Sequence, residues 1–435
     1  MKRPAYPRTK PSGVEWLGDV PEHWEVKRGR FAMRVNPPAP RLRALQPADE
    51  VSFIPMDAVG IVGGLNLEQT RVLADVSGGY TEFQDGDVVV AKITPCFENG
   101  KAALASGLMN GAAYGTTELH VLRAGPTLDC SFLFYVAISD TFQKLGESEM
   151  YGAGGQKRVP PEFNKNFRTP LPPSAEQRFI AAFLDRETRR IDRLVNKKRE
   201  LIQRLKEKRT ALISRAVTRG LPPAVARAAG LPTDSTLKPT DLDWLGDIPS
   251  QWKLKKLRYL CEITTGDKDT IDALDEGEFP FFVRSQTVER IDSYSFDCEA
   301  VLTAGDGVGV GKVFHHHQGK FAAHQRVYVL HNFKEISGRF LFMFMKEFFA
   351  RLALGGEAKS TVDSLRRPIF TDFVVLLPPP AEQAAITAYL DKEIAKLDAL
   401  VDKVEEAVER LQEYRTALIT AAVTGKVDVQ KEMAA

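Results

Sequence analysis

The sequence has no long hydrophobic run and no clustered cysteines. No apolar stretch reaches the roughly 18–20 residues that a helix needs to span a bilayer. The first residues, Met1-Lys2-Arg3-Pro4, do not introduce the apolar core of a signal peptide. The four cysteines lie far apart and form no Cys-x-x-Cys pair, which argues against a disulfide framework or a zinc site. We therefore expect a soluble, cytoplasmic protein with reduced thiols, no metal and no membrane contact.

An excess of either charge is also missing. The chain of 435 residues has 59 Lys and Arg against 57 Asp and Glu, which gives a formal net charge of +2. This balance neither supports nor excludes a nucleic-acid partner. The length is too great for one ordinary core, and 43% hydrophobic with 27% charged residues is typical of globular proteins. Two or more domains are therefore expected.

An internal duplication is present instead. The motif Trp16–Pro21, followed by Trp24, recurs 228 positions later as Trp244–Pro249, followed by Trp252. The block Leu171–Gln177 (LPPSAEQ) recurs 206 positions later as LPPPAEQ, and RTALI at 209–213 recurs at the same offset. The fall in offset from 228 to 206 means that the middle of the first copy is 22 residues longer. The ends of the two copies are alike and their middles differ.

Each copy is predicted to contain an α/β domain followed by a long helix. The middles, residues 25–170 and 253–376, hold short apolar runs broken by Gly, Asp and Pro, which indicate strands and turns, with short helices at 131–145 and 336–353. The fold class is thus α+β, with two globular domains related by a pseudo-two-fold axis and joined by two long helices. The predicted segments are a first domain at 1–170, a helix at 171–220, a linker at 221–243, a second domain at 244–376, a helix at 377–426 and a tail at 427–435.

The two helices are predicted to form a coiled coil. More than 40 residues without Gly or Pro follow each Pro-Pro block, Ser174 and Gln177 suggest an N-terminal capping box, and Gly220 and Gly425 suggest the ends. Apolar residues recur with heptad spacing. The predicted pairing residues are Leu184, Ile191, Leu205 and Leu212, with Leu194 and Leu201, on the first helix, and Leu390, Leu397, Val404, Leu411 and Leu418, with Leu400 and Tyr414, on the second.

Charge favours pairing of these two helices with each other. Residues 174–220 hold 14 Lys and Arg and 6 Asp and Glu, a net +8, whereas residues 380–426 hold 6 and 9, a net −3. In antiparallel packing the pair would set a fixed spacing between the two domains. Two alternatives stay open: the charges form solvated faces, or the basic first helix passes near DNA phosphates.

The order of variable region, Pro-Pro-x-x-Glu-Gln helix, variable region and second such helix resembles that of the specificity subunits of Type I restriction-modification systems. The blocks around Trp16 and Trp244 are similar to those that precede each target-recognition domain of that family. Ala91–Lys101 also resembles the family, as do Gly305–Gly307, Gly311–Phe314 and His324–Val327. The resemblance implies a non-catalytic chain without a cofactor. It would join two methyltransferase subunits, which use S-adenosylmethionine to methylate adenine, and two motor-nuclease subunits, which use ATP and Mg, on double-stranded DNA.

Candidate DNA-binding residues are Arg, Lys, Asn, Gln, Thr and His side chains in loops of the two variable regions, because such groups recognise base edges and phosphates. Base-specific residues are also expected in the stretches 36–80 and 264–300, where no motif identifies them. The candidates are Lys92, Thr94, Asn99, Lys101, Gln156, Lys157 and Arg158 in the first copy, and Lys312, His324, Gln325, Arg326 and Lys359 in the second. For each of them, the simpler interpretation is a solvated charge or a hydrogen bond that stabilises its loop.

Other motifs favour structural roles. Trp16, Trp24, Trp244 and Trp252 are interpreted as packing anchors, and His315–His317 as solvated loop histidines, because consecutive residues rarely bind one metal ion. Asn36-Pro37-Pro38-Ala39 lacks the aromatic residue of a methyltransferase loop, and Gly305–Lys312 departs from the phosphate-loop spacing. A DNA-specificity subunit is therefore favoured over a stand-alone DNA methyltransferase and over a coiled-coil scaffold without a DNA role.

Overall fold

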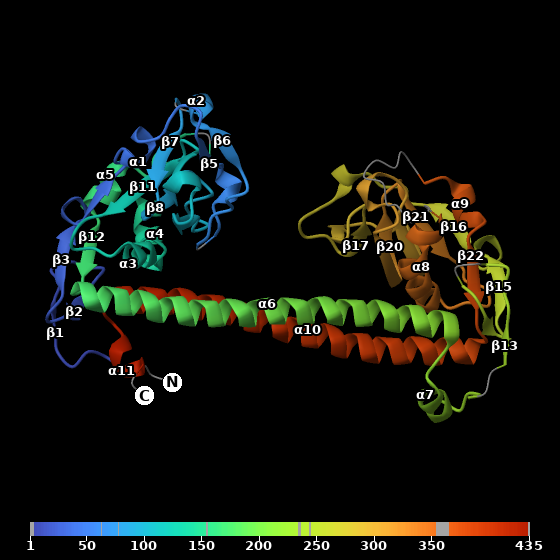
Figure 1. The fold of residues 1–435 in the computed structure, drawn as a ribbon. Coiled ribbons are helices and arrows are strands. Elements are labelled where there is room, and N and C mark those ends of the chain that lie inside the picture. Colours follow the sequence, from blue (N-terminus) through green and yellow to red (C-terminus); the bar gives the residue numbers. More distant parts are fainter. Residues whose placement is uncertain are drawn as a thin grey trace. The chain divides into compact units, whose positions relative to one another are not determined.

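The computed structural model describes residues 4–61, 63–76, 78–153, 155–233, 236–242, 245–353 and 365–433. The chain divides into two compact units, Met1–Arg199 with Glu406–Ala435, and Glu200–Glu405. Each unit contains an α/β domain and one part of each of two long helices (Figure 1). The division falls within the long helices, whereas the segments predicted from the sequence treat each helix as separate. Those segment bounds stay predictions.

The first unit is built on two four-stranded sheets. Their strand orders are β6-β5-β10-β7 and β4-β11-β8-β9, and the short pairs β1-β2 and β12-β3 complete the set. The strands are β1 Thr9–Pro11, β2 Asp19–Pro21, β3 Glu25–Arg28, β4 Met33–Val35, β5 Glu50–Ile54, β6 Thr70–Val72, β7 Thr81–Gln84, β8 Asp87–Ala91, β9 Ala102–Leu104, β10 Ala112–Gly115, β11 Leu119–Ala124 and β12 Arg168–Leu171. The short helices are α1 Pro40–Arg43, α2 Leu73–Val76, α3 Cys130–Ala137, α4 Asp140–Ser148, α5 Pro161–Asn166 and α11 Val429–Met433.

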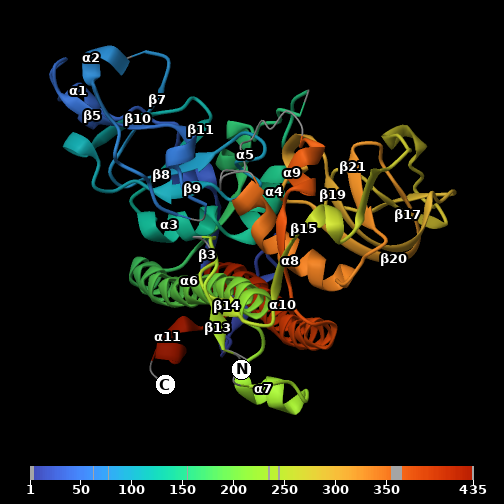
Figure 2. The same cartoon turned by 90° about the vertical axis from the view of Figure 1, so that its right-hand side faces the viewer.

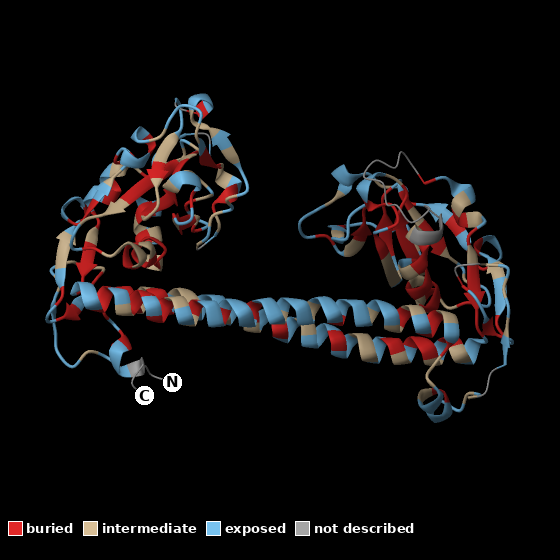
Figure 3. Ribbon diagram, viewed as in Figure 1, coloured by how far each residue is buried: buried red, intermediate tan, exposed pale blue. Residues whose placement is uncertain are grey.

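Burial explains these elements of the first unit. All five residues of β8 are buried, which accounts for its unbroken apolar run, since both faces of this strand are covered (Figure 3). The sequence predicted one helix at 131–145, but the structure has two. The Asp129 carboxylate caps α3 by accepting from the Ser131 and Phe132 amides, and the Ser139 hydroxyl caps α4 by accepting from the Phe142 amide. A second capping residue inside the predicted helix therefore starts a new helix.

The second unit has one six-stranded sheet of order β16-β21-β19-β20-β17-β18, with the short pairs β13-β14 and β15-β22. Its strands are β13 Leu237–Lys238, β14 Ile248–Pro249, β15 Lys253–Lys256, β16 Glu262–Thr265, β17 Phe279–Phe282, β18 Glu289–Ile291, β19 Phe296–Ala304, β20 Phe314–Ala323, β21 Val327–His331 and β22 Val374–Leu377. Its short helices are α7 Pro223–Ala228, α8 Gly338–Ala353 and α9 Arg367–Thr371. The helix predicted at 336–353 is α8.

The two domains share a strand order although their sequences differ. The order β4-β11-β8-β9 of the first unit returns as β16-β21-β19-β20 in the second. In the first unit β10 runs parallel to β5, and in the second β20 runs parallel to β17. The difference seen between the middles of the two copies is therefore one of sequence and loop length, on a common topology.

The long helices α6, Ser174–Arg219, and α10, Pro380–Val423, lie side by side in both views (Figures 1 and 2). Gly220 and Gly425, with φ of +78° and +71°, follow their ends as predicted. In the second unit Arg209 contacts Asp398 at 3.2 Å and Lys206 contacts Glu405 at 3.9 Å. Going from Lys206 to Arg209 along α6, the partner on α10 moves back from Glu405 to Asp398, so the helices are antiparallel. The predicted fold class, two α/β domains joined by two paired long helices, is confirmed.

The buried face of each helix agrees with one predicted row of residues. Leu184, Ile191 and Leu205 on α6 are buried, as are Leu390, Leu397, Val404 and Leu418 on α10, while Leu212 and Leu411 are half-buried. The second predicted row is wrong, because Leu194, Leu201, Leu400 and Tyr414 are 42–44% exposed.

A row that is more fully covered lies one residue later in both helices. It consists of Thr188, Val195, Ile202 and Arg209 on α6, and of Ile394, Val401, Val408, Arg415 and Ala422 on α10, all buried or half-buried. One residue corresponds to about 100° around a helix, so the choice between neighbouring positions decides which side chain is covered. Among the described residues, no helix is long and apolar enough to cross a membrane.

Candidate nucleic-acid interface

The Gln of each Pro-Pro-x-x-Glu-Gln block fastens its helix to the domain of its own unit. The buried Gln177 side chain donates from Nε2 to the carbonyls of Thr127 and Pro172, both at 2.8 Å, and accepts from the Asp129 amide at 2.7 Å. The capping box predicted for Ser174 and Gln177 is thus absent, because the Gln amide is engaged by residues outside the helix.

The second unit repeats this arrangement. Gln383 donates to the carbonyls of Glu335 and Pro378 at 2.8 Å and accepts from the Ser337 amide at 2.9 Å. We call Gln177 and Gln383, with these backbone partners, the Gln clamps. Each clamp sets the position of a domain on its helix, and hence of the loops that the domain carries.

The Glu of each block holds the tryptophan that opens the copy. Glu176 accepts from the Trp24 indole at 3.2 Å, and Glu382 accepts from the Trp252 indole at 2.8 Å. Both indoles are fully buried, so their predicted role as packing anchors is confirmed. Burial raises the pKa of the Glu382 carboxyl, and this outweighs the opposing effect of hydrogen bonds from Trp252 and Gln251.

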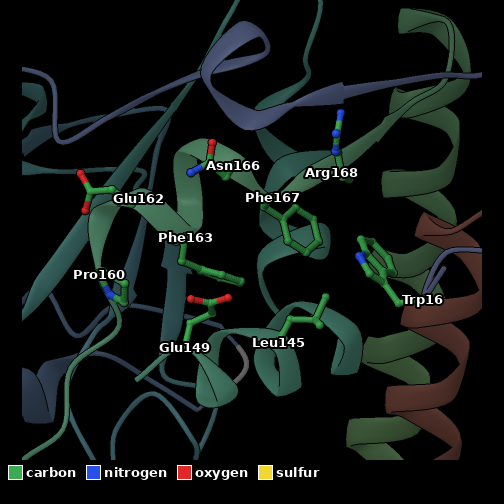
Figure 4. A pocket seen from close by; sticks show the side chains of 9 residues that line it. All are labelled: Trp16, Leu145, Glu149, Pro160, Glu162, Phe163, Asn166, Phe167 and Arg168. Carbon is green, nitrogen blue, oxygen red and sulfur yellow. The ribbon is translucent and has the colours of Figure 1, made fainter. Parts of the chain in front are cut away.

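Trp16 is a packing residue at the edge of a hollow, and its repeat Trp244 lies outside the described residues. The Trp16 ring stacks on Phe167 with centroids 5.3 Å apart. Figure 4 shows both rings beside a hollow of about 250 Å³, with Phe163, Glu149 and Glu162 also on its walls. Its aromatic side chains belong to the same packing that anchors the first unit, so base stacking by Trp16 has no support here.

Two loops of the first unit, which the sequence selected separately, lie next to each other. The Thr94 amide donates to the Lys157 carbonyl at 3.0 Å, and the Lys157 amide donates to the Thr94 hydroxyl at 2.8 Å. The Val159 amide donates to the Lys92 carbonyl at 2.8 Å. The structure therefore joins residues 92–101 and 156–158 into one surface, which we call the first reading surface.

Two candidate side chains of the first reading surface already have hydrogen-bond partners within the protein. The Lys101 ammonium donates to the Met56 carbonyl at 2.7 Å. Arg158 donates from Nε and Nη2 to both carboxylate oxygens of Glu118, at 2.9 and 2.8 Å, which lowers the pKa of Glu118. Asn99, Gln156 and Lys157 are exposed, and Lys92 and Thr94 are half-buried. Lys101 accordingly stabilises its loop, whereas the exposed side chains stay candidates for DNA contact.

In the second unit, two arginines from different loops converge on the carboxylate of Asp306. Arg326 donates from Nη1 to Oδ2 at 2.6 Å, and Arg284 donates from Nη1 to Oδ1 at 3.0 Å. Burial alone would raise the pKa of Asp306, but the hydrogen bonds from Arg326 and Arg284 lower it overall, so the carboxylate stays ionised. We call Arg284, Asp306 and Arg326 the second reading surface.

Other predicted residues of the second unit have different surroundings. His324 is 3% exposed, and its Nδ1 accepts from the Arg326 amide at 3.0 Å. Burial and the nearby arginines lower the pKa of His324, which keeps the ring neutral and able to accept this bond. His324 therefore supports the loop and is too buried to contact DNA. Gln325 donates to Asp269 at 2.9 Å, Lys312 is exposed, and Lys359 lies outside the described residues.

Arg284 was not among the residues selected from the sequence. It lies in the stretch 264–300, where base-specific residues were expected without any motif to identify them. Only the contact with Asp306, which is 22 positions away, reveals it. Glu118 was missed for the same reason, because its partner Arg158 is 40 positions away.

The histidine triplet forms part of a strand, contrary to the predicted loop. His315, His316 and His317 lie in β20 and are half-buried. His316 contacts Glu299 at 2.8 Å, while His315 and His317 flank the Phe282 ring. Alternation along a strand places neighbouring side chains on opposite faces, so the three rings cannot converge. In the described part of the chain, no group of three or more His, Cys, Asp and Glu could hold a metal ion.

Comparisons with known proteins point to one family. Residues 249–410 match the family model of the Type I restriction modification DNA specificity domain. The specificity subunit of the Type I restriction enzyme EcoEI from Escherichia coli is 38% identical over 168 residues, which are 38% of this chain and 28% of that protein. The corresponding EcoAI subunit, also from Escherichia coli, is 42% identical over 164 residues, 37% of this chain and 27% of that protein. The chain thus spans less than a third of the length of these two relatives.

Solved structures share the fold. One, from work on complex assembly and conformational transition of the type I R-M system, has a TM-score of 0.74 at 17% identity and covers 94% of this chain and 99% of that one. The HsdS subunit from Thermoanaerobacter tengcongensis has a TM-score of 0.53 at 17% identity and covers 94% of this chain and 98% of that one. At this identity the likeness concerns the fold alone.

Proposed function

We propose that this chain is a specificity subunit of a Type I restriction-modification system and selects the DNA sequence on which the system acts, each unit reading one half of a bipartite target. The observation that carries the proposal is the match of residues 249–410 to the DNA specificity domain, in a chain whose two units repeat one strand order. Each unit also has the same Gln clamp beneath a different set of loops.

In this proposal the chain has no catalytic activity of its own. Methyltransferase partners would supply adenine methylation with S-adenosylmethionine, and motor-nuclease partners would supply ATP-driven cleavage. This chain would bind double-stranded DNA through its reading surfaces and dock the methyltransferase subunits on the helices and domain flanks. The antiparallel helix pair supports a role in setting the spacing between the half-targets, because a helix is a stiff spacer.

A domain exchange tests the proposal. Residues 25–170 are replaced by the corresponding region of another specificity subunit, and the methylated sequences of the host genome are determined. One half of the methylated target should change while the other half and its adenine stay the same. If both halves change, or neither does, the assignment of one half-target to each unit is wrong.

Two further measurements separate this function from the alternatives. The purified chain, given S-adenosylmethionine and DNA without partners, should transfer no methyl groups, whereas a stand-alone methyltransferase would. DNA binding by the assembled complex should weaken steeply with salt, since phosphate contacts release counterions. A scaffold without a DNA role predicts binding that is absent or independent of salt.

A further inference from the structure

One backbone position carries opposite charges in the two units. In the first unit the Lys92 amide, directly after β8, donates to the Glu118 carbonyl at 2.9 Å, directly before β11. In the second unit the Gly305 amide, directly after β19, donates to the Arg326 carbonyl at 2.8 Å, directly before β21. Since β8 and β11 occupy the same places in the strand order as β19 and β21, Glu118 and Arg326 are structural equivalents.

The Arg326 guanidinium is anchored in a way that leaves one edge open. Asp306 receives only the Nη1 donor of Arg326, and the structure gives this side chain no second acceptor among the described residues. Arg158 of the first unit differs, because it donates both Nε and Nη2 to Glu118. The Nε–Nη2 edge of Arg326 is therefore available for a planar, two-bond contact.

The Arg326 side chain is much more exposed than the carboxylate that anchors it. The Arg326 side chain is 60% exposed and that of Arg284 is 43% exposed, whereas Asp306 is 15% exposed. Arg284, Asp306 and Gly307 line a hollow of about 380 Å³. The carboxylate that anchors Arg326 thus lies at the wall of a hollow, and an anchored guanidinium is held in one direction, which is what recognition of a flat group requires.

We propose that Arg326, held by Asp306 and flanked by Arg284, reads a guanine in the half-target of the second unit. This inference rests on the proposed function. An arginine edge matches the O6 and N7 acceptors that guanine presents in the major groove. The Asp306 carboxylate offsets one of the two arginine charges, so the cluster attracts a phosphate less strongly than two unpaired arginines would. The equivalent Glu118 cannot donate to guanine, so the two units are expected to read different bases at this position.

The test compares Arg326→Lys and Arg326→Gln with the control Arg339→Gln in the assembled methyltransferase complex. Arg339 belongs to another Arg–Asp pair of the same unit, with Asp391 at 2.5 Å, which joins α8 to α10. Lysine keeps the positive charge of Arg326 but lacks the planar Nε–Nη2 pair of donors. Both Arg326 variants should relax the methylated target at one guanine of one half, by roughly 5- to 150-fold in discrimination. Arg339→Gln should leave the target unchanged.

A second experiment uses the wild-type complex and changes the DNA, so its result does not depend on how a variant folds. Replacing that guanine by 7-deazaguanine removes its N7 acceptor and should weaken binding by the wild-type complex. Complexes with Arg326→Lys should show little further loss on the same duplex, since the contact is already missing. The inference is overturned if Arg326→Lys preserves the target, because a point charge would then suffice, or if no 7-deazaguanine substitution in that half-target weakens wild-type binding. A wild-type complex without any sequence-specific methylation would instead contradict the proposed function.

Discussion

Removal of one Gln clamp should destabilise the unit that contains it. Gln177→Ala deletes two bonds donated to carbonyls and one accepted from an amide, and the bond to Pro172 is fully buried. A buried carbonyl left without a donor costs about 1–3 kcal/mol, and each of the other two bonds contributes about 0.5–1.5 kcal/mol. The freed side-chain entropy of glutamine offsets up to about 2 kcal/mol. The three terms sum to about 2–6 kcal/mol with a midpoint of about 4 kcal/mol, so after this offset the expected net loss for the first unit is about 2–4 kcal/mol.

Calorimetry can measure this loss. For a unit of this size, 2–4 kcal/mol corresponds to a fall of roughly 4–16 °C in the Tm of the first unit. Gln412→Ala is the matched control, because Gln412 lies on the α10 part of the same unit and is exposed. Gln383→Ala should have the same effect on the second unit. Equal Tm values of the first unit for Gln177→Ala and Gln412→Ala would refute the reasoning, as would a Gln383→Ala variant that destabilises the first unit instead.

Three further predictions address the helix pair, a buried histidine and the first reading surface. Val195→Ala should lower the free energy of unfolding by about 1–3 kcal/mol, and Leu194→Ala by less than about 0.5 kcal/mol, since Val195 is 6% and Leu194 43% exposed. Urea titrations that gave the reverse order would contradict the row that includes Val195. Burial lowers the pKa of His120, so below about pH 6.5 the unfolded chain binds a proton that the folded unit does not, and stability falls as the pH falls. Urea titrations from pH 8 to 5 should show a smaller fall for His120→Gln. Lys157→Gln should lower the slope of log affinity against log salt by about 1 without altering the recognised sequence, as expected for a phosphate contact; an altered target would assign Lys157 to a base.

The sequence predicted the helix pair but left its second row ambiguous. Leu184 and Ile191 have no apolar neighbour at the following position that competes with them, so heptad spacing alone identified the first row. In the second row, Leu194 is followed by Val195 and Leu400 by Val401, and both alternatives are apolar. Spacings of three and of four residues both satisfy a heptad pattern, so only packing against the partner helix selects the covered member of each pair.

Contacts between distant residues explain what the sequence could not predict about the candidate site. The Pro-Pro-x-x-Glu-Gln block was recognised as the start of a helix, but the partners of Gln177 lie 48 and 50 positions earlier in the chain. Arg284 belongs to no motif, and only the carboxylate beside it draws attention to it as a candidate. Composition and spacing describe local structure well, whereas a surface formed by several loops depends on the fold.

Two ion pairs show how the duplication separates support from recognition. Arg415 contacts Asp192 in the first unit, and Arg209 contacts Asp398 in the second. The two pairs are copies of each other: Arg415 lies 206 positions after Arg209, and Asp398 lies 206 positions after Asp192. In an antiparallel helix pair, a residue and its copy face equivalent partners. A substitution at such a copied position therefore removes one of two equivalent supports. The side chains of Glu118 and Arg326 instead pair with Arg158 and Asp306 in their own domains, outside the helix pair and the Gln clamps, so we expect a change at either residue to leave the frame in place. Under the proposed function, that independence would allow one duplicated frame to carry two different recognition surfaces.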